Sequence, residues 1–147
     1  MSKKVYLASD HAGFDLKEAL MPFLKERGYE VEDLGPFTLE TNDDYPDTIM
    51  PLALRIANEQ TAKGIAIGAS GQGEAMVCNR IHGVRAAVFY GGDSAILTLS
   101  REHNNANVLC LGARMQSQAA AKSSVELWLT TEFSNEERHA RRIQKLN

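Results

Sequence analysis

The chain has 147 residues, of which 44% are hydrophobic and 24% charged, and its formal net charge is -3 at pH 7. These values are typical of one globular domain, residues 1–147, with a sizeable core, and the weak negative charge disfavours nucleic-acid and anionic-membrane partners. No apolar run reaches the roughly 18–20 residues of a membrane span, and the first residues lack a signal-peptide core. Two cysteines, Cys78 and Cys110, make no disulfide framework and are expected in the core, so we expect a cytoplasmic protein.

Strand-like apolar runs alternate with helical patterns along the chain. The first run is 4–8, and apolar residues then recur at helical spacing from Phe14 until Gly28 ends the pattern. A second strand at 29–34 and a polar loop follow, and Pro46 fits the first turn of the next helix. The later elements are a strand at 64–67, a short helix to about 80, a strand at 84–88, a helix at 94–101, a strand at 107–111 and a helix at 117–130.

This alternation predicts an α/β fold in which helices cover both faces of a five-stranded parallel sheet. Right-handed crossovers make it a three-layer, doubly wound, Rossmann-like sandwich. Such sheets bind ligands beyond the carboxyl ends of their strands. We expect three turns to meet at that edge, namely 10–11, 70–74 and 112–114.

A glycine-rich turn, Gly68-Ala69-Ser70-Gly71-Gln72-Gly73-Glu74, follows the third strand. Its glycines let the backbone approach a ligand and aim N–H groups at it, and the helix N-terminus behind them favours negative charge. An anion cradle beside the Glu74 carboxylate suits chemistry in which a proton leaves carbon and charge builds on oxygen. A plain strand-to-helix connection stays open. The order G-x-x-G-x-G disfavours a dinucleotide site, and no G-x-x-x-x-G-K-[ST] marks a nucleoside triphosphate site.

Two polar pairs at strand and helix ends are candidates for chemistry, each with a structural alternative. Asp10 and His11 are either ligand contacts or a capping aspartate with a surface histidine. His103 and Asn104 are either site residues or a helix C-terminal cap.

The last helix is predicted from a capping box, in which Ser134 stands three residues before Glu137. Arg138 and Arg142 lie four residues apart and therefore share one face of that helix. The pair is either a solvated face or a bidentate phosphate clamp.

The order and spacing of several short motifs resemble the type B ribose-5-phosphate isomerase family, which also contains galactose-6-phosphate isomerase subunits. The resemblance covers nearly the whole chain. Its motifs are Ser9-Asp10-His11-Ala12-Gly13, Asp44-Tyr45-Pro46-Asp47, the glycine turn, Asn79, Gly83-Val84-Arg85-Ala86, His103-Asn104-x-x-Asn107, Gly112-Ala113-Arg114 and Arg138-His139-x-x-Arg142.

The resemblance implies interconversion of an aldose phosphate and a ketose phosphate through a cis-enediolate, without metal or cofactor. Glu74 would carry the proton between C2 and C1, while Ser70 and the N–H groups of Gly71-Gln72-Gly73 would hold the developing oxyanion. In one branch of the family the base is a cysteine just before the glycine turn. Gly68 occupies that position here, so the chain resembles the glutamate branch.

The resemblance also assigns the remaining substrate contacts. His103 would help to open the sugar ring, and Asp10 would contact the sugar hydroxyls and the carbonyl end. The implied phosphate ligands are His11, Arg114, Arg138 and Arg142, and Tyr45 and Asn104 would complete the sugar contacts.

Topology separates one pair from the rest of this site. His103 and Asn104 precede the 107–111 strand and so belong at the amino ends of the strands, whereas all other groups, both C-terminal arginines included, are expected at the carboxyl ends. His103 would then serve a neighbouring subunit, which agrees with the interfacial sites of the family. We therefore expect a homodimer with shared active sites and a C-terminal helix that packs on the partner; pairing into tetramers stays open.

Two other classes of function stay open beside the isomerase. A sugar-phosphate sensor would keep the phosphate ligands without the base, although Glu74 and Ser70 argue against it. A flavodoxin-like module would need a first loop rich in Ser, Thr and Gly, whereas 9–13 carries Asp10 and His11. Among isomerase substrates, ribose 5-phosphate, allose 6-phosphate, galactose 6-phosphate and a tetrulose phosphate are the alternatives.

Overall fold

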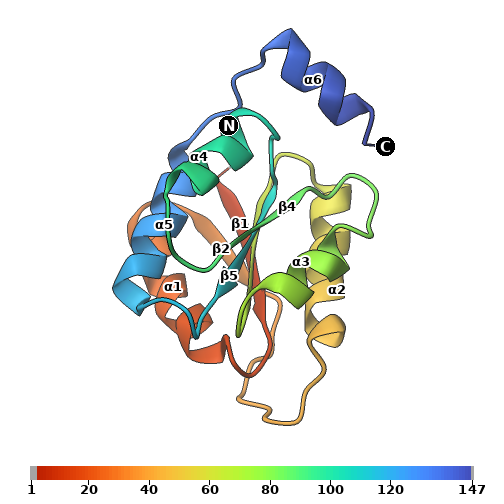
Figure 1. Ribbon diagram of the computed structural model, residues 1–147. Helices are drawn as coiled ribbons and strands as arrows, with labels where there is room; N and C mark the ends of the chain where they lie inside the picture. The colour runs from red at the N-terminus through yellow and green to blue at the C-terminus, as the bar shows by residue number, and fades with distance from the viewer. Residues whose placement is uncertain (1–2, 147) are drawn as a thin grey trace.

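A computed structural model describes residues 3–146 and contains a sheet of five parallel strands in the order β2-β1-β3-β5-β4 (Figure 1). The strands are β1 (Lys4–Ser9), β2 (Glu30–Asp33), β3 (Lys63–Gly68), β4 (Ala86–Phe89) and β5 (Val108–Gly112). The helices are α1 (Phe14–Glu26), α2 (Tyr45–Asn58), α3 (Gln72–Cys78), α4 (Ala95–Glu102), α5 (Gln118–Thr130) and α6 (Glu137–Gln144). The predicted α/β architecture is confirmed, and within residues 3–146 no helix has both the length and the apolarity to cross a membrane.

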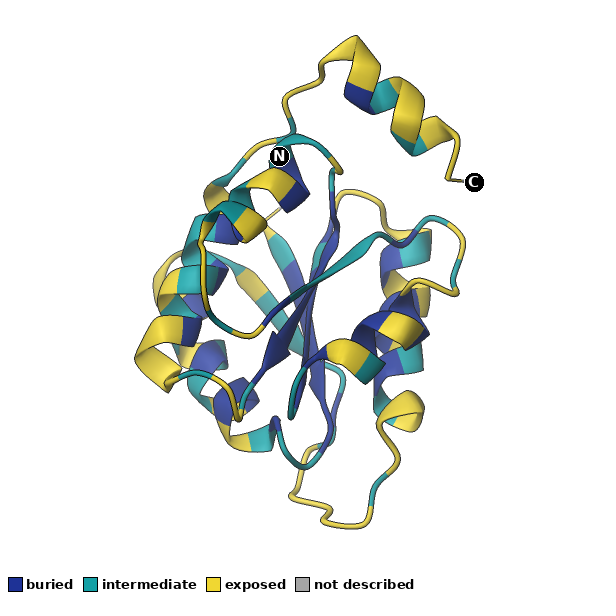
Figure 2. Cartoon of the chain, viewed as in Figure 1, coloured by how far each residue is buried: buried dark blue, intermediate teal, exposed yellow. Residues whose placement is uncertain are grey.

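Side chains alternate across the central strands and divide the core between the two faces of the sheet. On one face, Leu7 and Ile67 pack with α1, α4 and α5. On the other, Ala8 and Cys110 pack with α2 and α3, where Cys78 lies. The central strands are buried in Figure 2, and both cysteines are free and buried, as predicted.

The strand order creates a crevice between the carboxyl ends of β1 and β3. The chain goes from β1 outward to β2 and then crosses back to β3 on the other side of β1, which makes this the switch point where such folds bind ligands. The N–H of Asp10 donates to the carbonyl of Ile67 at 3.1 Å, and the N–H of Ala113 donates to the carbonyl of Gly68 at 2.8 Å. The three predicted turns therefore meet at one edge.

Helix α6 begins differently from its prediction. It starts at Glu137 with Glu136 at the N-cap and without a side-chain cap, so the predicted capping box is wrong. The Ser134 hydroxyl instead accepts the N–H of Glu136 at 3.3 Å, while its own N–H donates to the carbonyl of Glu102 at 3.1 Å. This bond attaches the segment before α6 to the end of α4, at the edge opposite the crevice (Figure 1).

Candidate active site

Asp10 opens the turn that follows β1. It is 9% exposed, and its Oδ1 accepts the N–H of Gly13 at 3.0 Å, so the capping role is present at that oxygen. The turn packs tightly because a Cβ at Gly13 would lie 2.4 Å from the carbonyl oxygen of Ile67. Close backbone approach thus holds Asp10 at the mouth of the crevice.

The predicted glycine turn is present between the end of β3 at Gly68 and the start of α3 at Gln72. Gly71 has a φ of +82°, in the left-handed region that favours glycine. The Ser70 hydroxyl accepts the N–H of Gln72 at 3.3 Å. Within residues 3–146, the N–H groups of Gly71 and Gly73 have no hydrogen-bond acceptor. Two backbone donors are therefore available to a ligand oxygen at this turn.

Glu74 lies in the first turn of α3 and is 3% exposed. Its carboxylate fills the space beside Gly68, because a Cβ there would lie 2.1 Å from one carboxylate oxygen and 2.4 Å from the other. Burial raises the pKa of the Glu74 carboxyl; a backbone N–H opposes this, and the nearby Asp10 carboxylate adds to it. A carboxylate with a raised pKa is a better proton acceptor from carbon at neutral pH.

The space beside Gly68 has room for only one side chain, and the Glu74 carboxylate fills it. A residue other than glycine at that position would occupy the space that the Glu74 carboxylate fills. A thiol at 68 and a carboxylate from 74 would compete for the same place.

A cavity of about 440 Å³ opens beside the crevice and is lined by Asp10, His11, Asp43, Asp44, Tyr45, Pro46 and Asp47. The Tyr45 ring packs on Gly73, where a Cβ would lie 2.7 Å from the ring carbon Cζ. The His11 ring nitrogen Nδ1 lies 2.7 Å from Oδ1 of Asp43. The structure thus brings Tyr45 and His11 to the crevice as predicted.

The sequence motifs did not identify Asp43 as a site residue. It stands in the polar 35–44 loop, 32 residues from its partner His11, and no periodic pattern marks it. The only available signal was its position directly before the Asp44-Tyr45-Pro46-Asp47 motif.

Arg114 lies at the same edge of the sheet. Its N–H donates to the carbonyl of Ala69 at 3.1 Å, next to the glycine turn, and its side chain is exposed. The guanidinium is therefore free to reach an anion at this edge.

His103 lies at the opposite end of the sheet, as the topology predicts. It follows α4 as the C-cap residue, and its ring stacks on that of His139 in α6, with centroids 4.1 Å apart and an interplanar angle of 16°. His139 is 5% exposed. Burial lowers the pKa of His139, and the neighbouring His103 and Arg138 lower it further.

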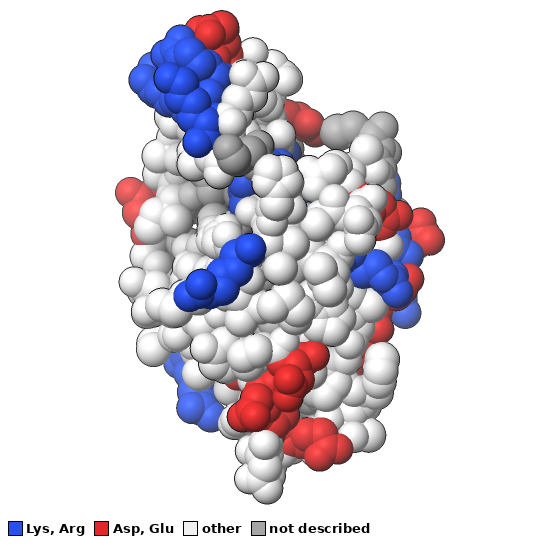
Figure 3. All heavy atoms as spheres, turned by 90° about the vertical axis from the view of Figure 1, so that its right-hand side faces the viewer, with Lys and Arg blue, Asp and Glu red and all other residues white. Residues whose placement is uncertain are grey.

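The two C-terminal arginines do not lie where they were expected. They flank His139 on α6 and so belong to the amino-end group with His103, which corrects their predicted place at the carboxyl ends. The physical reason is that α5 returns the chain to the amino edge and the 131–136 segment continues along it. Arg138 forms a 3.0 Å ion pair with Glu136, and both arginines are exposed. In Figure 3, basic side chains gather at the α6 end and acidic ones at the other end.

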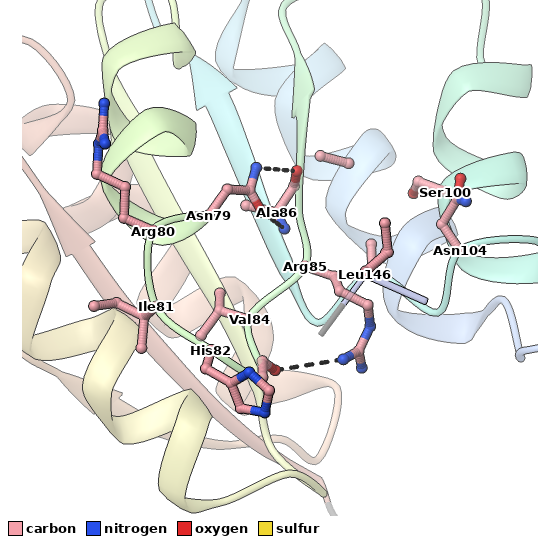
Figure 4. Close-up of a pocket in the computed structure, with 13 residues that line it drawn as sticks. Asn79, Arg80, Ile81, His82, Val84, Arg85, Ala86, Ser100, Asn104 and Leu146 are labelled. Atoms are coloured by element: carbon pink, nitrogen blue, oxygen red, sulfur yellow. Dashed lines mark hydrogen bonds between the residues drawn. The ribbon is translucent and has the colours of Figure 1, made fainter. Parts of the chain in front are cut away.

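Figure 4 shows a second cavity, of about 560 Å³, and Glu74 is not among the residues that line it. It is enclosed by the α3–β4 connection, the end of α4 and Leu146, and it includes Asn104. Asn79 exchanges two hydrogen bonds with the backbone of Ala86, at 3.0 and 2.8 Å, and Arg85 donates to the carbonyl of Gly83 at 3.4 Å. The Asn79 and Arg85 side chains thus bond to backbone groups of this part of the chain. Glu74 does not line this cavity, so we assign the proton transfer to the Glu74 crevice.

Within residues 3–146, no group of three or more His, Cys, Asp or Glu side chains is arranged to hold a metal ion.

Known proteins resemble this chain in sequence and in fold along nearly its whole length. The "Ribose/Galactose Isomerase" family model matches residues 5–146. Ribose-5-phosphate isomerase B of Mycolicibacterium paratuberculosis is 39% identical over 97% of this chain and 89% of its own length. The Clostridium thermocellum ribose-5-phosphate isomerase B structure is 40% identical, with a TM-score of 0.91 over 97% of this chain and 94% of that one.

A ligand-bound structure is also similar. Ribose-5-phosphate isomerase B of Mycoplasma genitalium, with bound ribulose-5-phosphate, has a TM-score of 0.92 and 36% identity, covering 97% of this chain and 93% of that one. The match in sequence and in fold extends over both ends of the sheet, from the Glu74 crevice to α6. The chain therefore belongs to the ribose/galactose isomerase family.

Proposed function

We propose that this protein interconverts ribose 5-phosphate and ribulose 5-phosphate, as a single isomerase domain. The observation that carries the proposal is the buried Glu74 carboxylate, whose pKa is raised, behind a glycine turn with unused N–H donors. The names of the similar proteins, one of them with bound ribulose-5-phosphate, support this substrate over a six-carbon sugar phosphate.

The proposed chemistry is a proton transfer between two neighbouring carbons. Glu74 removes the proton from C2 of the open-chain aldose phosphate and returns it to C1, so that a cis-enediolate forms in between. Because the Ser70 oxygen already accepts the N–H of Gln72, its hydroxyl proton is left to donate to the developing oxyanion. The N–H groups of Gly71 and Gly73 are the other proposed donors. One such donor contributes roughly 3–4 kcal/mol in well-studied enzymes.

The other carboxyl-end residues are proposed to orient the substrate. Asp10 contacts the sugar hydroxyls through its second carboxylate oxygen, since Oδ1 is engaged by Gly13. Tyr45 contacts the sugar, and His11 and Arg114 contact the phosphate. Fixing the phosphate supplies binding energy that aligns C1 and C2 with Glu74.

We further propose that the active unit is a homodimer, in which each site takes His103, Asn104, Arg138 and Arg142 from the partner. The supporting observation is that one chain holds these four residues at the sheet edge opposite Glu74. The basic α6 end and the acidic far end of the molecule are complementary in charge, which suits such an exchange (Figure 3). Large apolar residues that a partner would cover are exposed on α3, directly after β4, on α4 and after α6, namely Met76, Tyr90, Ile96, Leu99 and Leu146.

In this dimer the partner's ring-opening group, His103, would face the sugar oxygen while Arg138 and Arg142 bind the phosphate. The proposal extends to the cytoplasm as compartment, since the two buried free cysteines suit a reducing environment. A measurement of the molecular mass in solution decides whether such dimers pair into tetramers.

Two measurements test the proposed function. Turnover with ribose 5-phosphate, allose 6-phosphate, galactose 6-phosphate and a tetrulose phosphate should be highest with ribose 5-phosphate; another preferred sugar would replace the substrate, and no turnover would leave the sugar-phosphate sensor. For the dimer, inactive Glu74→Gln and His103→Asn chains are mixed after unfolding and refolding together. Regained activity supports shared sites, and activity no higher than either parent contradicts them.

A further inference from the structure

The 35–44 loop places a carboxylate against the His11 ring. Asp43 Oδ1 lies 2.7 Å from Nδ1 of His11 and also accepts the backbone N–H of His11 at 3.3 Å. The Asp43 side chain is 12% exposed and that of His11 is 35% exposed. One oxygen therefore holds both the ring and the backbone of the same histidine.

A fixed frame sets the position of Asp43. At the start of the loop, the fully buried Lys17 ammonium donates to Asp33 at 2.8 Å and to the carbonyl of Pro36 at 2.7 Å. At its end, the Thr48 hydroxyl of α2 donates to the carbonyl of Ser9 in β1 at 2.7 Å. The first anchor connects the loop to α1, and the second connects the start of α2 to the end of β1, which His11 follows.

This contact decides which nitrogen of His11 faces a ligand. A carboxylate can only accept, so the Nδ1 that faces it must carry a proton, whether the ring is neutral or charged. Nε2, on the other edge of the ring, is left for the substrate. Without such a partner, a neutral histidine in water carries its proton mainly on Nε2, so Asp43 selects the less common tautomer.

Stability alone gives a poor account of this arrangement. The second carboxylate oxygen of Asp43, Oδ2, is buried and has no hydrogen-bond partner among the described residues. A buried acceptor without a partner costs folding free energy. Three further carboxylates, those of Asp10, Asp44 and Asp47, line the same cavity, so another acid adds to the local charge repulsion.

We propose that Asp43 is a positioning residue of the active site, which fixes the His11 ring with its Nδ1 proton on the carboxylate and Nε2 toward the substrate. It acts through His11 and does not itself contact the sugar phosphate. The kinetic consequence rests on the proposed isomerase activity, whereas the tautomer assignment does not.

The test compares Asp43→Ala with Asp43→Asn. Because a single oxygen accepts both bonds from His11, the amide oxygen of asparagine can replace it, while alanine cannot. We expect KM for ribose 5-phosphate to rise about 10-fold or more in Asp43→Ala, by analogy with residues that orient a metal-binding histidine, whose loss weakens binding by that factor. Asp43→Asn should restore KM to within about threefold of wild type. Glu40→Gln, an exposed acid of the same loop, is the matched control and should not change KM.

The tautomer of His11 distinguishes the two roles of Asp43, because a purely structural role would leave it unchanged. Two-bond proton–nitrogen NMR of the four imidazoles, with His11 assigned by its loss in His11→Gln, should show the Nδ1–H form in wild type and Asp43→Asn. Asp43→Ala should shift His11 toward Nε2–H while its thermal unfolding stays cooperative. An Nδ1–H tautomer that persists in a folded Asp43→Ala protein would overturn the proposal, as would an unchanged KM. A wild-type protein without isomerase activity would instead refute the proposed function, and the NMR result would still decide the role of Asp43.

Discussion

The space beside Gly68 makes Gly68→Ala an informative substitution. The added Cβ would lie 2.1 Å from Oε1, 2.3 Å from Cδ and 2.4 Å from Oε2 of Glu74, far inside normal contact. The backbone around Gly68 belongs to the central β3 strand and cannot easily move, so the carboxylate must shift by about 1 Å or more. The clashing atoms are the end of one flexible side chain, so folding should be little affected.

The magnitude follows from the displacement. A misplacement of about 1 Å in a catalytic geometry costs roughly 100-fold in rate, which corresponds to about 2.7 kcal/mol of transition-state stabilisation. We therefore expect kcat for ribose 5-phosphate to fall about 100-fold in Gly68→Ala, with a thermal midpoint close to wild type. The assay is steady-state isomerisation, together with thermal unfolding of the same preparation.

Gly64→Ala is the matched control, because it makes the same change in the same strand. Its Cβ would meet core side chains instead, at 2.9 Å from Cδ2 of Leu52 and 3.2 Å from Cγ1 of Ile56. Overpacking of this kind costs about 1–3 kcal/mol of stability but leaves Glu74 in place. Full activity in Gly68→Ala would refute the reasoning about the base. The reasoning would also be refuted if Gly68→Ala and Gly64→Ala lost activity and were destabilised to the same extent.

Three further predictions follow from buried ionisable groups. Folding raises the pKa of Glu74, so its contribution to stability is complete below about pH 4.5 and is lost as pH rises through the folded pKa. Glu74→Gln should therefore be more stable than wild type at pH 8 in urea unfolding, and equal stability would contradict this. Folding lowers the pKa of His139, so the unfolded chain binds more protons and wild-type stability should fall as pH drops below about 6.5. In His139→Asn, stability should depend less on pH between pH 5 and 7, and an unchanged pH dependence would contradict this role of His139. Lys17→Ala should lower the free energy of unfolding by about 3 kcal/mol, because it leaves Asp33 without its buried partner. A loss below about 1 kcal/mol in urea titration would show that the ion pair contributes little to stability.

Local features of the sequence were sufficient for the glycine turn and for most elements. The turn after β3 and the start of α3 follow from glycine spacing after an apolar run, which is a short-range pattern. The meeting of Asp10 with the glycine turn followed from parallel topology, because carboxyl ends of parallel strands share an edge.

Features that depend on tertiary contacts could not be predicted in the same way. The Ser134–Glu137 spacing satisfies a capping rule, yet the bond from Ser134 to Glu102 redirects the chain and α6 begins later. That path also sets where Arg138 and Arg142 lie, and no local pattern encodes it. Asp43 was missed for the same reason, since its contact with His11 joins an irregular loop to a strand end.

The most direct test of the central claim is the turnover of Glu74→Gln with ribose 5-phosphate. Glutamine keeps the size of the side chain but cannot accept the proton from C2. Loss of a positioned general base costs about 100- to 10,000-fold, so we predict a fall in kcat within that range with little change in KM. A kcat within about threefold of wild type would contradict the assignment of Glu74 as the base.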